Sequence, residues 1–212
     1  MSNCSYLCAT NVEDTYPSFS DESYDPDVQT IACDVWCVPL LWMALFRPNN
    51  IVRKTFTVDG DDIVTEAPIV ARTLAIRQLV EAVPYFNKLF AAEGRLDEYA
   101  EFLQQALESV DYEYVTIELH EIACLADSEQ NFYDSFREAL AAIGTDETSG
   151  AKVRFSEIAA FRDLTKFPPA RLLLDEAGDP EPTDDDFWNH CRVCGAGQSQ
   201  SGLGLPVPWE PE

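Results

Sequence analysis

Basic side chains are scarce in this chain and are missing from long stretches of it. The 212 residues include only 14 lysines and arginines against 38 aspartates and glutamates, so the formal net charge is −24. No base occurs in residues 1–46 or in residues 96–136. A phosphate backbone or an anionic membrane would be repelled by such a chain. We therefore expect neither direct nucleic-acid binding nor membrane binding.

Long hydrophobic runs are also lacking. The most apolar stretch, "WCVPLLWMALF", covers residues 36–46, whereas a helix needs about 20 apolar residues to cross a bilayer. A secretory signal needs basic residues before its apolar run, and the first base here is Arg47. The seven cysteines are an odd number and suit reduced thiols better than a disulfide framework. These features predict a cytoplasmic protein.

Catalytic motifs are absent as well. The chain has two histidines, no serine in a nucleophile elbow, and no glycine-rich loop that joins a strand to a helix. His120 stands between Glu118 and Glu121, where a carboxylate would raise the pKa of an imidazole. We interpret it as an exposed histidine among carboxylates, with an acid–base pair as the alternative. The expectation is a protein that is not an enzyme and has no cofactor.

One metal-binding pattern is half present. His190 lies beside Cys191-x-x-Cys194, but the second ligand pair that tetrahedral zinc requires does not follow. The alternative is a set of unrelated apolar thiols. Two further cysteine pairs would complete a zinc site if the C-terminal part folded back: Cys4 with Cys8, and Cys33 with Cys37.

The first third of the chain predicts strands and one short helix. "NCSYLCATN" fits a strand, and the Ser- and Asp-rich segment 13–29 fits a loop. Pro39 suits the first turn of a helix that runs to Phe46. Alternation over residues 52–58, followed by Asp59-Gly60, predicts a hairpin with a short return strand at residues 63–64.

The middle of the chain predicts amphipathic helices around one strand. The segment 71–94 has a kink expected at Pro84, and its apolar face comprises Ile76, Leu79, Val80, Val83 and Phe90. Residues 95–110 form a second helix whose opposite face is acidic. "YEYVTIEL" alternates as a half-buried strand, and a third helix is capped at Asp127 or Ser128 and ends at Gly144. A weaker helix covers residues 155–164.

These elements predict an α+β fold: a small sheet of short strands with helices packed on one side. The expected domain spans residues 1–171. Residues 172–212 are rich in Asp, Pro and Gly and form an irregular acidic tail, which could pack through Phe187, Trp188 and Trp209.

The base-free segment 96–136 holds eleven carboxylates and is the strongest functional signal. Tyrosines among acids are typical of an interface, because the ring supplies apolar area while the acids pair with Lys and Arg of a partner. A solvating acidic surface is the alternative. The residues predicted to bind a partner are Asp97, Glu101, Glu108, Asp111, Tyr112, Glu113, Tyr114, Glu118 and Glu121.

Three short segments resemble a bacterial family of immunity-like proteins from polymorphic-toxin systems. They are "MSNCSYLCATN", "VWCVPLLWMALF" and "YVTIELHEIACLAD", and the matching residues are Asn3, Ser5, Tyr6, Leu7, Pro39, Leu40, Leu41 and Trp42. The chain departs from the family at Cys4, at Cys8 and in its acidic tail. The resemblance implies a protein that acts by occlusion and has no catalytic residues.

Three functions follow in order of preference. The first is an immunity-type protein that binds a cognate basic toxin, plausibly a nuclease, and occludes its active site through an acidic surface. The second is a nucleic-acid mimic that inhibits a restriction or CRISPR effector. The third is a zinc-binding adaptor or enzyme.

Overall fold

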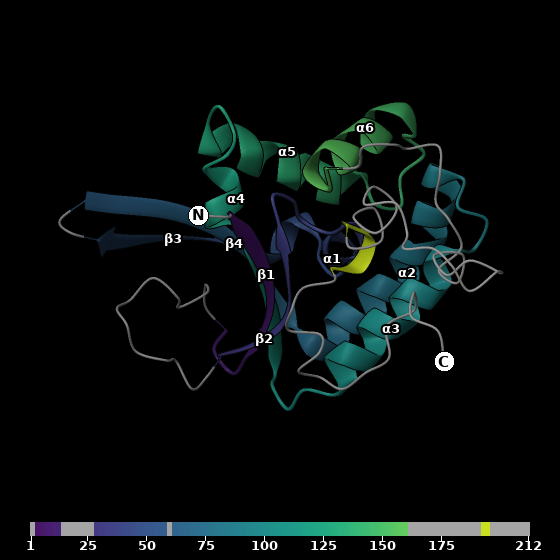
Figure 1. Cartoon of the computed structure of the whole chain (residues 1–212), viewed down its shortest axis with the longest axis horizontal. Coiled ribbons are helices and arrows are strands. Elements are labelled where there is room, and N and C mark those ends of the chain that lie inside the picture. Colours follow the sequence, from purple (N-terminus) through teal and green to yellow (C-terminus); the bar gives the residue numbers. More distant parts are fainter. Residues whose placement is uncertain (1–2, 14–27, 59–60, 161–191, 196–212) are drawn as a thin grey trace, which may run out of the picture.

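A computed structural model describes residues 3–13, 28–58, 61–160 and 192–195. Four of the five strands precede the long helices in the chain, and Figure 1 labels the elements. In chain order they are β1 (Cys4–Thr10), β2 (Val28–Val35), α1 (Leu40–Ala44), the 3-10 turn η1 (Pro48–Asn50), β3 (Ile51–Val58), β4 (Asp61–Ala71), α2 (Arg72–Phe90), α3 (Leu96–Glu108), β5 (Tyr114–Glu118), α4 (His120–Ala123), α5 (Glu129–Ala142) and α6 (Ser149–Ile158).

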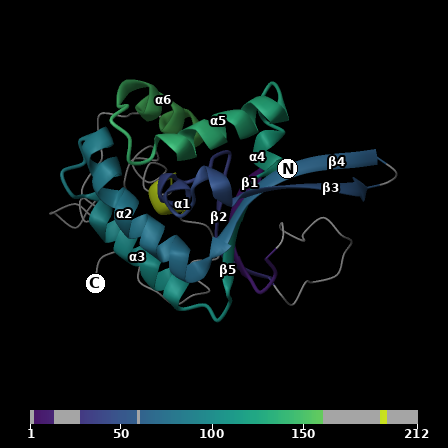
Figure 2. The same ribbon diagram turned by 180° about the vertical axis from the view of Figure 1, so that it is seen from behind.

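The strands form one five-stranded antiparallel sheet in the order β2-β1-β5-β4-β3. Helices α1, α2 and α3 lie together on one side of it, and the view from behind shows the same arrangement (Figures 1 and 2). The predicted α+β class is therefore confirmed. Strand β5 is the centre of the sheet because it pairs with β1 through residues 114–118 and with β4 through residues 69–71 of β4.

The core is built around α1. All five of its residues are fully buried, and it contacts α2, α3 and α6. Trp42 is the largest fully buried side chain, and its Nε1 donates to the carbonyl oxygen of Cys194 at 2.9 Å. A Cβ atom at Gly195 would lie 2.4 Å from the Trp42 ring, and Gly195 has φ +73°, so only glycine fits there. Residues 192–195 of the predicted tail thus belong to the core.

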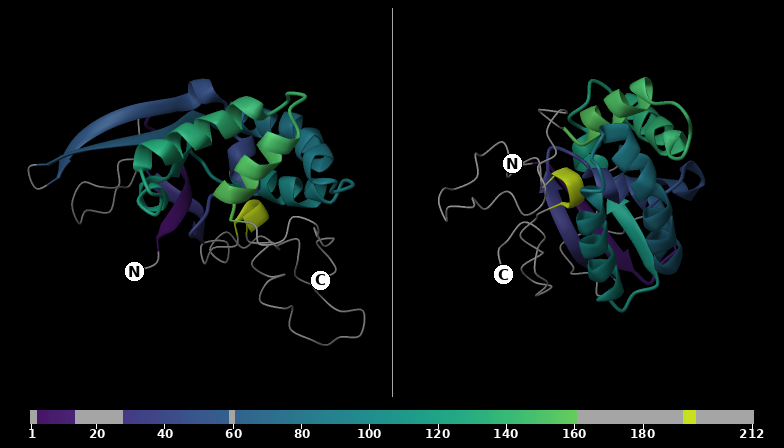
Figure 3. Two further views of the ribbon diagram at one scale, coloured as in Figure 1. Left: turned by 90° about the horizontal axis from the view of Figure 1, so that it is seen from above. Right: turned by 90° about the vertical axis from the view of Figure 1, so that its right-hand side faces the viewer.

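The β3–β4 hairpin extends beyond the body of the molecule (Figures 1 and 2). The hairpin prediction is confirmed, but the return strand has 11 residues, not a short run. Only its last three residues reach β5, so the rest of the hairpin pairs with itself. Helix α5 runs beside the base of the hairpin (Figure 3) and fixes it with side-chain contacts at Thr65 and Glu66.

Several boundaries differ from the expectations. Residues Val28 and Gln29, expected in a loop, begin β2, which the sequence did not predict. Val80, expected on the core face of α2, is 56% exposed. Pro84 lies inside α2, which continues to Phe90. Helix α6 starts at Ser149, six residues before the expected start.

Other expectations fall on residues outside the described part of the chain. These are the loop segment 14–27, the turn at residues 59–60, and the tail side chains Phe187, Trp188 and Trp209. The predicted cap of α5 is among the described residues, and the Ser128 side chain accepts the Asn131 N–H at 3.4 Å. Gly144, with φ +81°, follows the end of that helix, as expected.

Candidate functional site

Helix α3 separates apolar from acidic side chains. Tyr99, Leu103 and Leu107 are buried at a spacing of four residues, and this face packs on the core. The opposite face carries the exposed carboxylates Asp97, Glu98, Glu101 and Glu108. The two faces predicted from the sequence are confirmed. The acidic face is open to solvent along the whole helix.

Side chains of α2 hold both ends of α3. The Asn87 Oδ1 accepts the N–H groups of Gly94 at 3.2 Å and Leu96 at 3.3 Å, and its Nδ2 donates to Asp97 at 2.8 Å. At the other end, the Arg72 guanidinium donates to the carbonyl oxygens of Leu107 at 3.0 Å and Val110 at 2.6 Å. These bonds satisfy terminal groups that a helix leaves unpaired. They give the acidic face a fixed position.

Three arginine side chains donate hydrogen bonds to backbone carbonyl groups. Arg72 binds the end of α3, Arg47 binds the carbonyls of Ala44 and Phe46, and Arg95 binds the carbonyl of Ala92. Cations at helix ends also balance the helix dipole. These three bases therefore complete the fold, and they form no ion pair with a carboxylate of the described residues.

The ion pairs between described residues lie elsewhere. Arg137 pairs with Glu66 and Asp134, and Arg154 pairs with Glu138 and Glu147. None of these pairs, among the residues that the structure places, involves a carboxylate of α3 or of the loop after it. The carboxylates of this surface therefore form no ion pair with a Lys or Arg in the described part of the molecule.

The loop after α3 extends the acidic surface toward β5. Asp111 and Glu113 are exposed, and Tyr112 and Tyr114 are half-buried. The Tyr112 ring packs against the core. Desolvation raises the pKa of Tyr114, and the charges of Glu113 and Glu13 add to the rise. Hydrogen bonds from the Tyr114 side chain to Glu13 and Glu113 raise this pKa further, so the hydroxyl group stays protonated among acids.

Two predicted residues do not belong to this surface. Glu118 is only 4% exposed, because β5 is a central strand and is covered on both faces. The neighbouring Thr116 is fully buried too, so the predictions of a half-buried strand and of a surface role for Glu118 are wrong. Glu121 lies on α4, at the opposite end of β5 from Tyr114, and its carboxylate accepts the Cys4 N–H at 2.8 Å.

The acidic surface is therefore smaller than predicted. It comprises the exposed face of α3, the loop that follows, and Tyr114 at the start of β5, and we call it the α3 surface. Its predicted members are Asp97, Glu101, Glu108, Asp111, Tyr112, Glu113 and Tyr114.

The zinc pattern is not assembled in the described part of the chain. His190 and Cys191 lie outside it, and Cys194 is buried in the hydrophobic core. Cys8 and Cys37 are buried, and Cys4 and Cys33 are partly buried. Within the residues that the structure covers, these cysteines form no group with metal-ligand spacing.

A second surface feature was missed from the sequence. A hollow of about 350 Å³ lies between the segment after α4, α5 and α6, and its lining includes Trp36, Leu125, Phe132 and Glu157. Trp36 is 58% exposed and has φ +62°, which is rare for a bulky residue. The surrounding sequence gives no periodic signal for this hollow, because its walls come from segments far apart in the chain.

Comparison with protein-family models, curated proteins and solved structures finds no match to this chain. Among the described residues, no helix combines the length and apolar character that a bilayer crossing requires.

Proposed function

We propose that this protein is an immunity-type inhibitor that binds a basic protein toxin, such as a nuclease, through the α3 surface. The observation that carries the proposal is the arrangement of charges around α3. Its carboxylates face solvent without ion-pair partners among the described residues, while Arg47, Arg72 and Arg95 bind backbone carbonyls. A surface kept free of its own bases suits a partner that supplies them.

The partner's chemistry follows from the surface. Its contact region would carry Lys and Arg side chains spaced to meet Glu101 and Glu108, which lie two helical turns apart on one face of α3. Such complementarity raises association rates above the neutral level of about 10⁵–10⁶ M⁻¹s⁻¹. Fast capture is what an inhibitor of a lethal enzyme inside its own cell requires.

Two half-buried tyrosines follow α3, and their side chains are of the kind that forms the energetic centre of an interface. Tyr112 and Tyr114 combine apolar ring area with a hydroxyl group, and their backbone is held by β5 and the core. Aromatic side chains of this kind dominate binding energies, whereas charges at the rim mainly guide the encounter. The resemblance to immunity-like proteins points to the same mode of action, occlusion of an enzyme.

The experiment is co-expression with the basic protein encoded beside this gene in the source cell. We expect the chain to protect the host from that protein and to co-purify with it as a stoichiometric complex. Loss of protection, or a neighbouring product that does not bind, would contradict the proposal.

A competition assay separates the proposal from the nucleic-acid-mimic alternative. Purified chain is added to unrelated DNA-binding proteins on a fluorescent duplex. We expect no displacement, because an immunity-type surface fits one partner. General displacement of DNA would instead support the mimic.

A further inference from the structure

Outside the α3 surface, one group of side chains has the composition of a metal site. His120 is the first residue of α4, Cys124 follows the last residue of that helix, and Glu129 is the first residue of α5. Their ligand atoms all lie within 4.8 Å of one another. This is the only such group that the described residues contain.

The fold brings the three residues together. His120 and Cys124 are four residues apart, so one helical turn places them on the same side. The Ser128 cap turns the chain into α5 and presents Glu129 to that side. The Cys124 Sγ lies 3.7 Å from the His120 Nε2 and 3.6 Å from the Glu129 Oε1.

These distances fit a tetrahedral cation. With metal–nitrogen and metal–oxygen bonds of about 2.1 Å and a zinc–sulfur bond of about 2.3 Å, two ligands of a tetrahedron are separated by about 3.6 Å. Both sulfur distances therefore match the edges of a zinc tetrahedron. A nitrogen, a sulfur and an oxygen ligand together suit zinc far better than magnesium or calcium.

A buried carboxylate beside the group gives a second, independent indication. Glu118 is 4% exposed, and its Oε1 accepts the His120 N–H at 2.6 Å. Its Oε2 is buried and has no hydrogen-bond partner within the described structure. A buried carboxylate with an unsatisfied oxygen is costly unless a proton or a cation balances it.

The local electrostatics favour a cation too. The Glu129 Oε1 lies 3.6 Å from the Cys124 Sγ, and the buried carboxylate of Glu118 accepts the N–H of His120. Two carboxylates thus lie at the group. A bound divalent cation would balance their negative charge and would stabilise the Cys124 thiolate.

We propose that His120, Cys124 and Glu129 bind one zinc-class divalent cation. Three protein ligands leave the fourth tetrahedral position to water or to an incoming ligand, and Cys124 is exposed to solvent. The ion would also tie α4 to the start of α5. This site shares no residue with the His190, Cys191 and Cys194 pattern.

The test is a titration of the full chain, stripped of metal by a chelator, with Co²⁺ and then Zn²⁺. We expect one equivalent of Co²⁺ to bind with a thiolate-to-cobalt charge-transfer band and the intense visible bands of tetrahedral cobalt, and Zn²⁺ to displace it. Cys124→Ser should abolish the charge-transfer band. Loss of a ligand should weaken binding by more than the roughly 10–100-fold that outer-shell changes cost.

Matched variants keep the test specific. Glu129→Gln should weaken Co²⁺ binding, while Glu138→Gln on the same helix should not. Cys33→Ser and Cys191→Ser should retain the charge-transfer band. Far-ultraviolet circular dichroism of each variant checks that it is folded.

Absence of the band in the unmodified chain would overturn the proposal. So would a band that survives Cys124→Ser or disappears in Cys191→Ser. The assay uses no protein partner, so its outcome is independent of the inhibitor proposal.

Discussion

The two halves of the base-free segment use their carboxylates differently. Residues 96–113 place acids on the α3 surface, where they face solvent. Residues 114–136 use three of theirs in the structure: Glu118 is buried, Glu121 accepts the Cys4 N–H, and Asp134 pairs with Arg137. One acidic segment thus contains carboxylates that form an open surface and carboxylates that are buried or bonded within the fold.

The difference shows that composition alone does not locate a binding surface. A carboxylate that is buried or hydrogen-bonded contributes to stability and its pH dependence, whereas an exposed one contributes to the field that a partner meets. The comparison makes separate predictions for each half.

The largest effect is expected at Glu118. Burial raises its pKa from 4.5 to about 7. The folded state therefore binds this proton more tightly than the unfolded state, so the stabilisation is complete below about pH 4.5 and is lost as the pH rises through 7. Glu118→Gln, which stays neutral, should be more stable than the unmodified chain at pH 8, by about 3 kcal/mol.

Urea unfolding of both proteins from pH 4.5 to 8, with chelator present, checks this prediction. The difference in the free energy of unfolding between the two proteins should grow from pH 4.5 to about 7 and stay constant above that. Glu101→Gln is the matched control from the exposed half and should show no such gap. A gap that is the same at pH 4.5 and pH 8 would show that Glu118 does not titrate as described.

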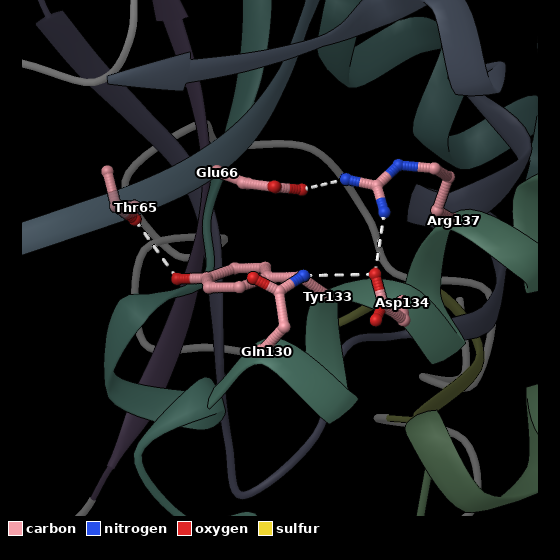
Figure 4. A network of polar contacts seen from close by, with 6 residues as sticks. All are labelled: Thr65, Glu66, Gln130, Tyr133, Asp134 and Arg137. Atoms are coloured by element: carbon pink, nitrogen blue, oxygen red, sulfur yellow. Dashed lines mark hydrogen bonds and ion pairs between the residues drawn. The ribbon is translucent and has the colours of Figure 1, made fainter. Parts of the chain in front are cut away.

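The next largest effect is expected at Arg137, which joins Asp134 of the second half to Glu66 of the hairpin (Figure 4). Glu66 is 5% exposed, so Arg137→Ala leaves a buried charge without its partner. Arg137 itself is 38% exposed in its side chain. Water can therefore reach part of the site, and the loss should be about 2 kcal/mol, less than for a fully buried pair.

A double variant tests the cause of that loss. Arg137→Gln combined with Glu66→Gln removes both charges and should recover part of the stability in thermal unfolding. Beside this pair, the Tyr133 hydroxyl and Thr65 are 3.1 Å apart and are unchanged in the variant (Figure 4). No recovery would mean that packing of the Arg137 side chain, not its charge, holds the hairpin.

The smallest effect on stability is expected on the α3 surface. Glu101→Gln with Glu108→Gln should change the free energy of unfolding by less than about 0.5 kcal/mol, because both residues are exposed and outside the core. The change should be slightly stabilising at low salt, since like charges on one helix face repel. A decrease in the free energy of unfolding of more than 1 kcal/mol would show that these acids, like Glu118, are part of the structure and do not form an open surface.

Local patterns in the sequence were sufficient to predict α3 and the helix at 129–142. Their apolar residues recur every three or four positions, and a cap marks the start of α5. The polar face of β5 could not be predicted in the same way. Thr116 and Glu118 alternate with apolar residues as on a half-exposed strand, yet both are buried in the folded protein. The sequence pattern does not show that β5 lies inside the sheet with both of its faces covered.

Long-range contacts explain the other errors. In β2 the apolar Ile31 and Ala32 are adjacent and Asp34 is buried, so the strand lacks the expected alternation. Residues 192–195 look like part of a polar tail, yet Trp42 binds the Cys194 carbonyl 152 positions away. His120 and Glu129 come together only because a short helix ends at Cys124 and a second one begins at Glu129.

The α3 surface as a docking site is tested most directly by association kinetics with the neighbour-encoded basic protein. Two variants with the same change in net charge are compared: Glu101→Gln/Glu108→Gln on α3, and Asp146→Asn/Glu157→Gln around α6. We expect the α3 pair to slow association about tenfold at low salt, with the gap closing near 1 M salt, where screening extends to about 3 Å. Equal rates for both variants, or a larger loss for the second, would contradict the account.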